Sequence, residues 1–175
     1  GQLAGETIEK LTGGSGKVGV ITGVFGATQH EKRMNGALDY LSEKVPGIEI
    51  VGKFENKDKA ETAYSLTKDM ITANPDLKIV YVTAGGPFGA AKAIQDMGLT
   101  GKVQVVAYDH IPENVKYVRT GEIAAAIAQD PFGQGFDTVV TMYNYLVAGE
   151  KPASDFIPVK LDVLTPDNVN QLFPE

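Results

Sequence analysis

The sequence has 175 residues, 43% of them hydrophobic, with 22 acidic against 16 basic side chains and a net charge of −6. This length suits one domain with a real core, and the lack of cysteine excludes disulfides, iron–sulfur clusters and a thiol nucleophile. The acidic balance argues against nucleic-acid binding, which needs Lys and Arg against phosphate. No apolar run approaches the roughly 20 residues of a membrane helix. We therefore expect a chain that is not embedded in a membrane and binds no nucleic acid.

Short runs rich in Val and Ile recur along the chain and predict buried β-strands. Between them, apolar residues return at helical spacing, as at Met34, Ala37, Leu38 and Leu41. Such alternation indicates a three-layer α/β/α fold with a mostly parallel, doubly wound sheet, in which ligands bind beside the carboxyl ends of the strands. The predicted strands are 17–22, 48–53, 78–83, 102–107 and 123–128.

The last part of the chain has a different pattern. Residues 131–149 predict an amphipathic helix that ends at Gly149, and the apolar residues beyond it predict a strand near 156–161 followed by irregular chain. One face of this helix is bulky for a terminal helix and would invite association if it were exposed. That face carries Phe132, Phe136, Val139, Val140, Tyr143, Leu146 and Val147.

Two glycine-rich loops, at 23–29 and 83–89, follow predicted strands, where a parallel sheet presents its ligands. Their glycines would let backbone N–H groups approach a ligand, or would simply make tight turns. A third run, at 13–17, precedes a strand and has no Ser or Thr after its Lys, which favours a helix-to-strand turn over a phosphate loop. The dinucleotide pattern G-x-G-x-x-G is absent from both ligand-facing loops.

Three polar side chains fall near the predicted carboxyl edge of the sheet. Asp109 ends the fourth strand, Gln129 follows the fifth, and Arg33 lies early in the helix after the first. Each has a simpler alternative when taken alone, since Arg33 could be an ordinary surface residue and Asp109 could cap a loop. Together they would converge on one site of polyhydroxyl size, where planar polar groups make paired hydrogen bonds.

Groups suited to catalysis are few. The sequence has no serine elbow with matching His and Asp, no outstanding carboxylate pair, and no metal-ligand spacing for His30 and His110. A phosphoacceptor receiver domain would need an acidic pair after the first strand, where Thr22 and Gly23 stand instead. We therefore expect neither an enzyme nor a bound cofactor or metal.

Several ordered runs together resemble one known family. The chain is similar to the ribose-type periplasmic sugar-binding proteins of ABC importers, whose ligand-binding core is shared by lactose-repressor-type regulators. The likeness extends over nearly all 175 residues. It rests on the runs KVGVITG, EKRMNGALDYL, PGIEIV, NPDLKIVYV, GAAKAIQDMGLTGKVQVVAYD, PENVKYVRTGEIAAAIAQDPFGQG and LTPDN.

The resemblance implies a two-lobed clamp that closes over a sugar. Residues 1–129 would form its carboxy-terminal, ligand-binding lobe, and a complete amino-terminal lobe would be missing ahead of them. Residues 130–160 would belong to that missing lobe, and 161–175 would be a tail that returns to the carboxy-terminal lobe.

By position, the resemblance assigns Arg33 to fork onto sugar hydroxyls, Asp109 to accept from them, and Gln129 to bond the ligand from the hinge. Thr83 stands where ribose-type members usually have Asn or Asp, which implies an altered contact. Around Asn56 the family often has an aromatic residue that stacks on the sugar ring, and this sequence has none. Stacking would then come from Phe25, from the missing lobe, or from neither.

The function implied is reversible binding of a small sugar or polyol as part of the solute-binding protein of an ABC importer. Its partners would be the ABC-transporter membrane subunits, and its location periplasmic or, with a lipid anchor, extracellular. The alternative is a ligand-sensing module of a sensor kinase or a transcriptional regulator. Without a partner lobe, we expect 131–149 to repack on its own sheet, to form a homodimer, or to bind the missing lobe.

Overall fold

One six-stranded sheet organises the computed structural model, which describes residues 1–174. Its strand order is β2-β1-β3-β4-β5-β6, and every neighbouring pair is parallel except β5 and β6. A helix separates each successive pair of the first five strands, as connections between parallel strands require. The strands are β1 (Ser15–Thr22), β2 (Gly47–Glu55), β3 (Leu77–Val82), β4 (Gln104–Tyr108), β5 (Ile123–Ala128) and β6 (Asp162–Leu164).

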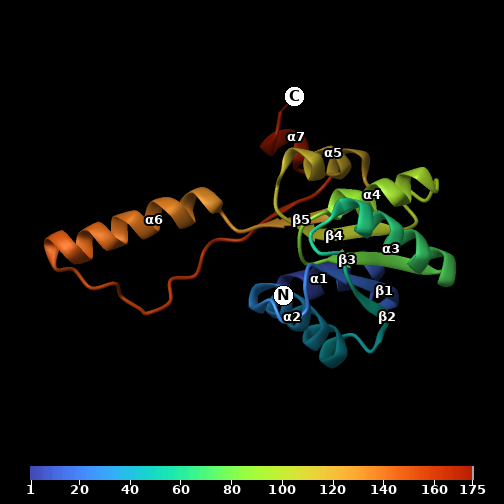
Figure 1. Cartoon of the computed structure of the whole chain (residues 1–175), viewed down its shortest axis with the longest axis horizontal. Coiled ribbons are helices and arrows are strands. Elements are labelled where there is room, and N and C mark those ends of the chain that lie inside the picture. The colour runs from blue at the N-terminus through green and yellow to red at the C-terminus, as the bar shows by residue number, and fades with distance from the viewer. Residues whose placement is uncertain (175) are drawn as a thin grey trace.

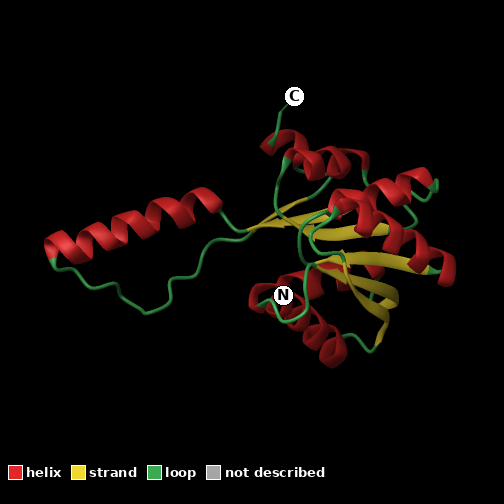
Figure 2. Ribbon diagram, in the orientation of Figure 1, coloured by secondary structure: helices red, strands yellow, loops and turns green. Residues whose placement is uncertain are grey.

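Helices cover both faces of this sheet (Figures 1 and 2). One core cluster packs α1 and α2 against it, and the other packs α3, α4 and α5 against the opposite face. The three-layer, doubly wound fold predicted from the sequence is therefore confirmed. The helices are α1 (Gln2–Thr12), α2 (Thr28–Lys44), α3 (Ala60–Ala73), α4 (Pro87–Asp96), α5 (Pro112–Thr120), α6 (Pro131–Tyr143) and α7 (Val169–Leu172), and a π-helical turn, Asn144–Ala148, continues α6.

The glycine-rich run 13–17 joins a helix to a strand, as the sequence favoured: Gly13 and Gly14 form the turn, and the rest of the run already belongs to β1. Gly13 ends α1 in the left-handed conformation with φ 65°, and β1 begins at Ser15. A glycine suits this position because it has no Cβ to clash there. The run joins a helix to a strand on the edge of the sheet opposite the ligand-facing loops.

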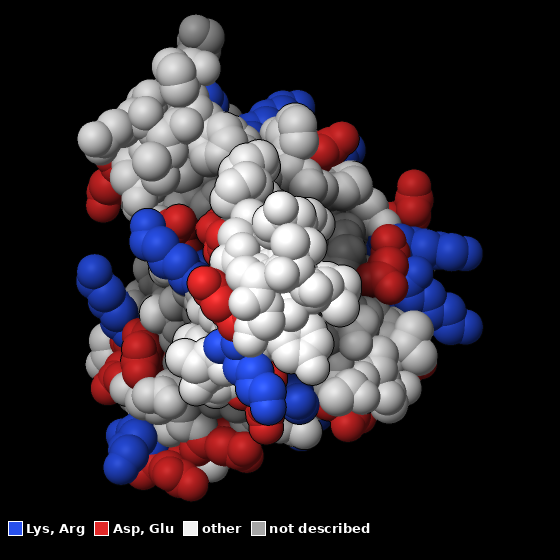
Figure 3. All heavy atoms as spheres, turned by 90° about the vertical axis from the view of Figure 1, so that its left-hand side faces the viewer, with Lys and Arg blue, Asp and Glu red and all other residues white. Residues whose placement is uncertain are grey.

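Helix α6 and the π-helical turn form an arm that projects away from the sheet, and irregular chain leads back from its tip (Figures 1 and 2). All of α6 is described, and none of its residues is buried. The expectation that 131–149 repacks on its own sheet is therefore wrong: the arm leaves the body at Asp130 and its apolar side chains reach no strand. Figure 3 views the molecule from the arm's end, where uncharged atoms fill the centre and charged residues lie around them.

The strand predicted near 156–161 is also absent, since these residues are irregular and exposed. Strand formation needs a neighbouring backbone to pair with, and this segment lies along the arm, away from the sheet (Figure 1). The strand comes just afterwards, as β6, whose Leu164 pairs antiparallel with Ala126 of β5. The final stretch is also more regular than expected, because it holds both β6 and α7.

Residues 1–174 contain neither a membrane-spanning helix nor a cluster of metal ligands. No helix there has the length and apolar character needed to cross a membrane. No group of three or more His, Cys, Asp or Glu side chains in the same residues is arranged to hold a metal ion.

Candidate functional site

Arg33 is held at the carboxyl edge of the sheet by two contacts. It projects from α2, and its guanidinium carbon lies 4.1 Å from the centre of the Tyr108 ring at the end of β4. Its Nη1 donates to the Thr83 carbonyl, just after β3, at 2.8 Å. A cation on an aromatic face is attracted by the ring quadrupole, and the guanidinium has five N–H donors, more than this one bond uses. The arrangement therefore fixes a planar donor group over the strand ends.

Two buried tyrosines at the ends of neighbouring strands contact Arg33. The Tyr81 hydroxyl donates to the backbone carbonyl of Arg33 at 2.9 Å and lies 3.0 Å from the Tyr108 hydroxyl. Burial raises the pKa of Tyr81 well above its ordinary value and also raises the pKa of Tyr108. Both hydroxyls therefore stay protonated near neutral pH. The pair anchors Arg33 at its backbone through Tyr81 and at its guanidinium through Tyr108.

Asp109 and Gln129 meet at the ends of β4 and β5. The Gln129 Nε2 faces the Asp109 Oδ1 at 3.4 Å, and the Asp109 N–H donates to the Ile127 carbonyl at 2.9 Å. Asp109 is exposed and adopts the left-handed conformation with φ 71°. Asp130, the residue after Gln129, caps α6 by accepting from the Gly133 N–H at 2.9 Å. The structure thus brings Asp109 and Gln129 together, while Asp130 serves the arm.

Thr83 and Asn56 lie in the interior, each with 0% of its surface exposed. The Thr83 hydroxyl donates to the Thr22 hydroxyl at 2.9 Å, and the Asn56 amide donates to the Gly85 carbonyl at 2.7 Å. Both side chains are therefore engaged within the protein, where they hold neighbouring loops together. The carbonyl of Thr83, rather than its side chain, joins it to Arg33.

Phe25 lies in the loop after β1 and is 46% exposed. Its backbone N–H donates to the Glu55 carboxylate at the end of β2. In the described part of the chain, its ring makes no aromatic or cation–π contact, so it does not contact the Arg33 guanidinium in this way. Of the six residues singled out from the sequence, Arg33, Thr83, Asp109 and Gln129 thus lie along neighbouring strand ends, and Phe25 and Asn56 lie toward β2.

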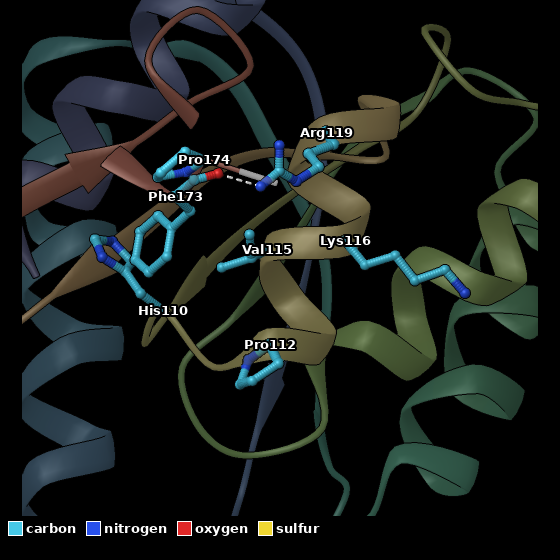
Figure 4. A pocket seen from close by; sticks show the side chains of 7 residues that line it. All are labelled: His110, Pro112, Val115, Lys116, Arg119, Phe173 and Pro174. Atoms are coloured by element: carbon cyan, nitrogen blue, oxygen red, sulfur yellow. Dashed lines mark hydrogen bonds between the residues drawn. The ribbon is translucent and has the colours of Figure 1, made fainter. Parts of the chain in front are cut away.

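A separate pocket of about 410 Å³ opens beside α5 (Figure 4). His110 lies on one side of it with its ring edge-on to Phe173, at 5.8 Å between centroids. The His110 Nε2 is 2.9 Å from the Ala126 carbonyl. This pocket could not be predicted from the sequence, because it forms only where the end of the chain folds against α5. Its lining residues are His110, Pro112, Val115, Lys116, Arg119, Phe173 and Pro174.

Comparison with known proteins identifies the family. Residues 1–151 match the family described as "Periplasmic binding protein domain". The chain belongs to this family. Among curated members, the D-allose-binding periplasmic protein of Escherichia coli K12 is 34% identical over 152 residues, which are 86% of this chain and 49% of that protein. The ribose import binding protein RbsB of the same strain is 28% identical over 165 residues, 94% of this chain and 54% of RbsB.

Solved structures of sugar-binding proteins have the same fold. GanP, a glucose-galactose binding protein from Geobacillus stearothermophilus, has a TM-score of 0.86 at 26% identity, covering 99% of this chain and 60% of GanP. A solute-binding protein from Actinobacillus succinogenes with bound D-allose has a TM-score of 0.87 at 27% identity, covering 98% and 59%. The chain spans about half the length of the curated relatives it matches.

The tyrosine pair was missed from the sequence. Tyr81 and Tyr108 each fall within a predicted buried strand or at its end, where they resemble ordinary core residues. The tyrosines themselves could have indicated the pair, because each lies near the carboxyl end of a predicted strand and a buried Tyr hydroxyl needs a hydrogen-bond partner. Asn114, which donates to the Tyr108 and Asp109 carbonyls, was missed as well.

Proposed function

We propose that this chain is the carboxy-terminal ligand-binding lobe of a solute-binding protein that reversibly binds a small sugar or polyol for an ABC importer. The observation that carries the proposal is the set of groups at one sheet edge: the Arg33 guanidinium, the Asp109 carboxylate and the Gln129 amide. The names of the relatives, which refer to allose and ribose, support it. Their description as periplasmic and import proteins supports the same location and the same membrane partners for this chain.

The chemistry of the three groups suits a polyhydroxyl ligand. Arg33 can only donate, an ionised Asp109 can only accept, and the amide of Gln129 does both. A sugar hydroxyl also donates and accepts, so adjacent hydroxyls can bond to Arg33 and Asp109 at once. Such binding makes and breaks no covalent bond. The relatives compared above are likewise named as binding proteins, which favours binding without catalysis.

Thr83 and Asn56 have supporting roles in this proposal. Thr83 fixes Arg33 through its carbonyl, and Asn56 holds the loop at Gly85. Phe25, which is exposed beside the same edge, is the residue available to stack on a ligand from this lobe. The ligand contacts made directly by this lobe are thus Arg33, Asp109 and Gln129, with Phe25 as a further apolar surface.

Calorimetric titration with D-allose, D-ribose, D-arabinose and xylitol tests this function. We expect weak binding by the 175-residue chain, because one lobe contacts only one side of a ligand. Closure of two lobes over the ligand cannot then add to the affinity. Arg33→Ala and Asp109→Ala should each weaken binding by about tenfold or more, as loss of a charged hydrogen bond does. Lys32→Ala and Asp137→Ala remove the same charges from exposed positions and should bind like the parent chain.

Two results would contradict the assignment. Submicromolar binding by this chain alone would mean that the site has been misplaced, because the proposed edge is open on one side. Unchanged binding by Asp109→Ala would remove Asp109 from the site.

The arm belongs, in this proposal, to a second lobe: residues 1–129 and 161–175 form one lobe, and 130–160 pack into the other. Its exposed apolar side chains support this, since Phe132 is 78% and Leu146 69% exposed, and such surfaces attract a partner. A second copy could cover the same surface and give a homodimer. Light scattering at several protein concentrations separates these cases. If copies associate through the arm, the measured mass should rise with concentration. The double substitution Phe132→Asp with Leu146→Asp should abolish that rise. A concentration-independent monomer would exclude the homodimer and leave the second lobe as the partner.

A further inference from the structure

Asp109 is held in an uncommon backbone conformation by three anchors. Its φ of 71° lies in the left-handed region, which few residues other than glycine adopt, although Asp and Asn tolerate it better than most. Its N–H donates to the Ile127 carbonyl at 2.9 Å. The carbonyl before it, of Tyr108, and its own carbonyl accept from one Asn114 amide at 3.1 and 2.9 Å. The N–H and the carbonyl of Asp109, and the carbonyl before it, are therefore all hydrogen-bonded.

Asn114 is unusual for its place in the fold. It lies in the first turn of α5, only 1% exposed, near the apolar residues Val115 and Val118 of the same helix. Among residues 1–174, its Oδ1 is buried and has no hydrogen-bond partner. An unpaired buried oxygen destabilises the folded protein, because it has lost its hydrogen bonds to water and gained none in return. An amide at this position therefore destabilises the fold through its oxygen, but its nitrogen donates to the peptides on both sides of Asp109.

We propose that Asn114 is the positioning residue for the Asp109 carboxylate. By holding the carbonyls of Tyr108 and Asp109, it keeps Asp109 left-handed and so sets the direction in which the carboxylate leaves the chain, toward Gln129. Asn114 itself is buried and acts through Asp109. The positioning role is inferred from these contacts alone, whereas its effect on the affinity for a sugar rests on the function proposed above.

A fixed carboxylate discriminates between ligands. It accepts well only from hydroxyls that approach along its own direction, so epimers that point a hydroxyl elsewhere bind less well. If Asn114 is removed, Asp109 can relax to an ordinary conformation and its carboxylate can point in several directions. Affinity for the best sugar should fall, and the spread of affinities across a panel of epimers should narrow.

The experiment uses the whole chain with Asn114→Ala and a matched control, Asn74→Ala. Asn74 also donates its side-chain amide to a backbone carbonyl, that of Met70 at 3.1 Å, but it lies before β3, at the opposite edge of the sheet. The first readout is the φ of residue 109, from NMR backbone shifts and the N–H to Hα coupling, which needs no ligand. The second is the affinity for D-allose and D-ribose in the parent and in the Asp109→Ala background.

We expect Asn114→Ala to move Asp109 out of the left-handed region and to lower affinity about tenfold, the size of a lost charged hydrogen bond. The same change in the Asp109→Ala background should have little effect, since the group it positions is gone. Asn74→Ala should leave both readouts unchanged. If Asn114→Ala does not fold, Asn114→Ser keeps one donor for the two carbonyls and should give a smaller shift in the same direction.

Either of two results would overturn the proposal: an Asp109 that stays left-handed without the Asn114 amide, or an equal loss of affinity in both backgrounds. A parent chain that binds none of the sugars would refute the proposed function. In that case a displaced Asp109 in Asn114→Ala would still support the positioning role.

Discussion

Replacing Tyr81 with Phe removes one oxygen from the support of Arg33 and leaves the ring in place. The Tyr81 side chain is fully buried, and its hydroxyl bonds to the Arg33 carbonyl at 2.9 Å and to the Tyr108 hydroxyl at 3.0 Å. Each such bond contributes about 0.5 to 1.5 kcal/mol net, and buried partners left unpaired add to the cost. We expect Tyr81→Phe to lower the free energy of unfolding by about 1 to 3 kcal/mol.

The same variant should change how stability depends on alkaline pH. Burial is the main cause that raises the pKa of both Tyr81 and Tyr108 in the folded protein. The stability linked to a raised pKa is fully present below the unfolded value, about 10 for Tyr, and is lost as pH rises through the folded pKa. Each such tyrosine lowers the unfolding free energy by up to about 1.4 kcal/mol per pH unit in that range. The difference between the parent and Tyr81→Phe should therefore shrink above pH 10.

Urea denaturation followed by circular dichroism, at pH 7 and at intervals up to pH 11, measures both effects. Tyr64→Phe is the matched control, because the Tyr64 hydroxyl makes one bond, to Asp96 at 3.1 Å, near the surface. It should change the unfolding free energy by no more than about 0.5 kcal/mol, as surface substitutions usually do. The reasoning fails if the two variants unfold at the same urea concentration, or if the deficit of Tyr81→Phe stays constant to pH 11.

Three further outcomes follow from local geometry. Gly89→Ala should lower the melting temperature markedly, because its Cβ would lie 2.0 Å from the Ala60 carbonyl oxygen and would push α3 and α4 apart. Gly135→Ala is the control, since a Cβ there would meet no atom within 4 Å and should leave the melting temperature unchanged. Equal melting temperatures for the two variants would refute this. Asp130→Ala removes the side-chain cap of α6 and should reduce helical circular dichroism while the unfolding of the sheet is unchanged. Limited trypsin digestion should cut first after Lys160, which is exposed in irregular chain, and mass spectrometry of the early fragments would show a different first site if this is wrong.

The sheet could be predicted because its signals are local. The Val- and Ile-rich runs, the helical spacing between them and the Gly and Pro stops all point to the same alternation, and the order of parallel strands brings their carboxyl ends to one edge. The sequence placed Asp109 and Gln129 at this edge because each follows a predicted strand, and the structure adds that the two strands are neighbours. Arg33 was placed near the same edge by its position early in α2.

The supporting contacts could not be predicted, because they depend on side-chain directions across the sheet. Nothing in the spacing of Tyr81 and Tyr108 shows that their hydroxyls meet, or that Arg33 lies over one of the rings. Asn114 follows Asp109 by five residues, but the left-handed turn that brings its amide back to Asp109 is visible only in three dimensions.

The arm shows the same division between local and long-range signals. Asp130 caps α6, Pro131 begins it and Gly149 ends the π-helical turn, so the helix was predictable without any partner. Where the helix packs depends on the surface opposite its apolar face, which the sequence pattern does not contain. The arm begins two residues after Gln129, so in the proposed function a second lobe that packs on the arm would also lie beside the proposed ligand-binding edge. The apolar contact on the arm would then determine where the second lobe approaches the bound ligand.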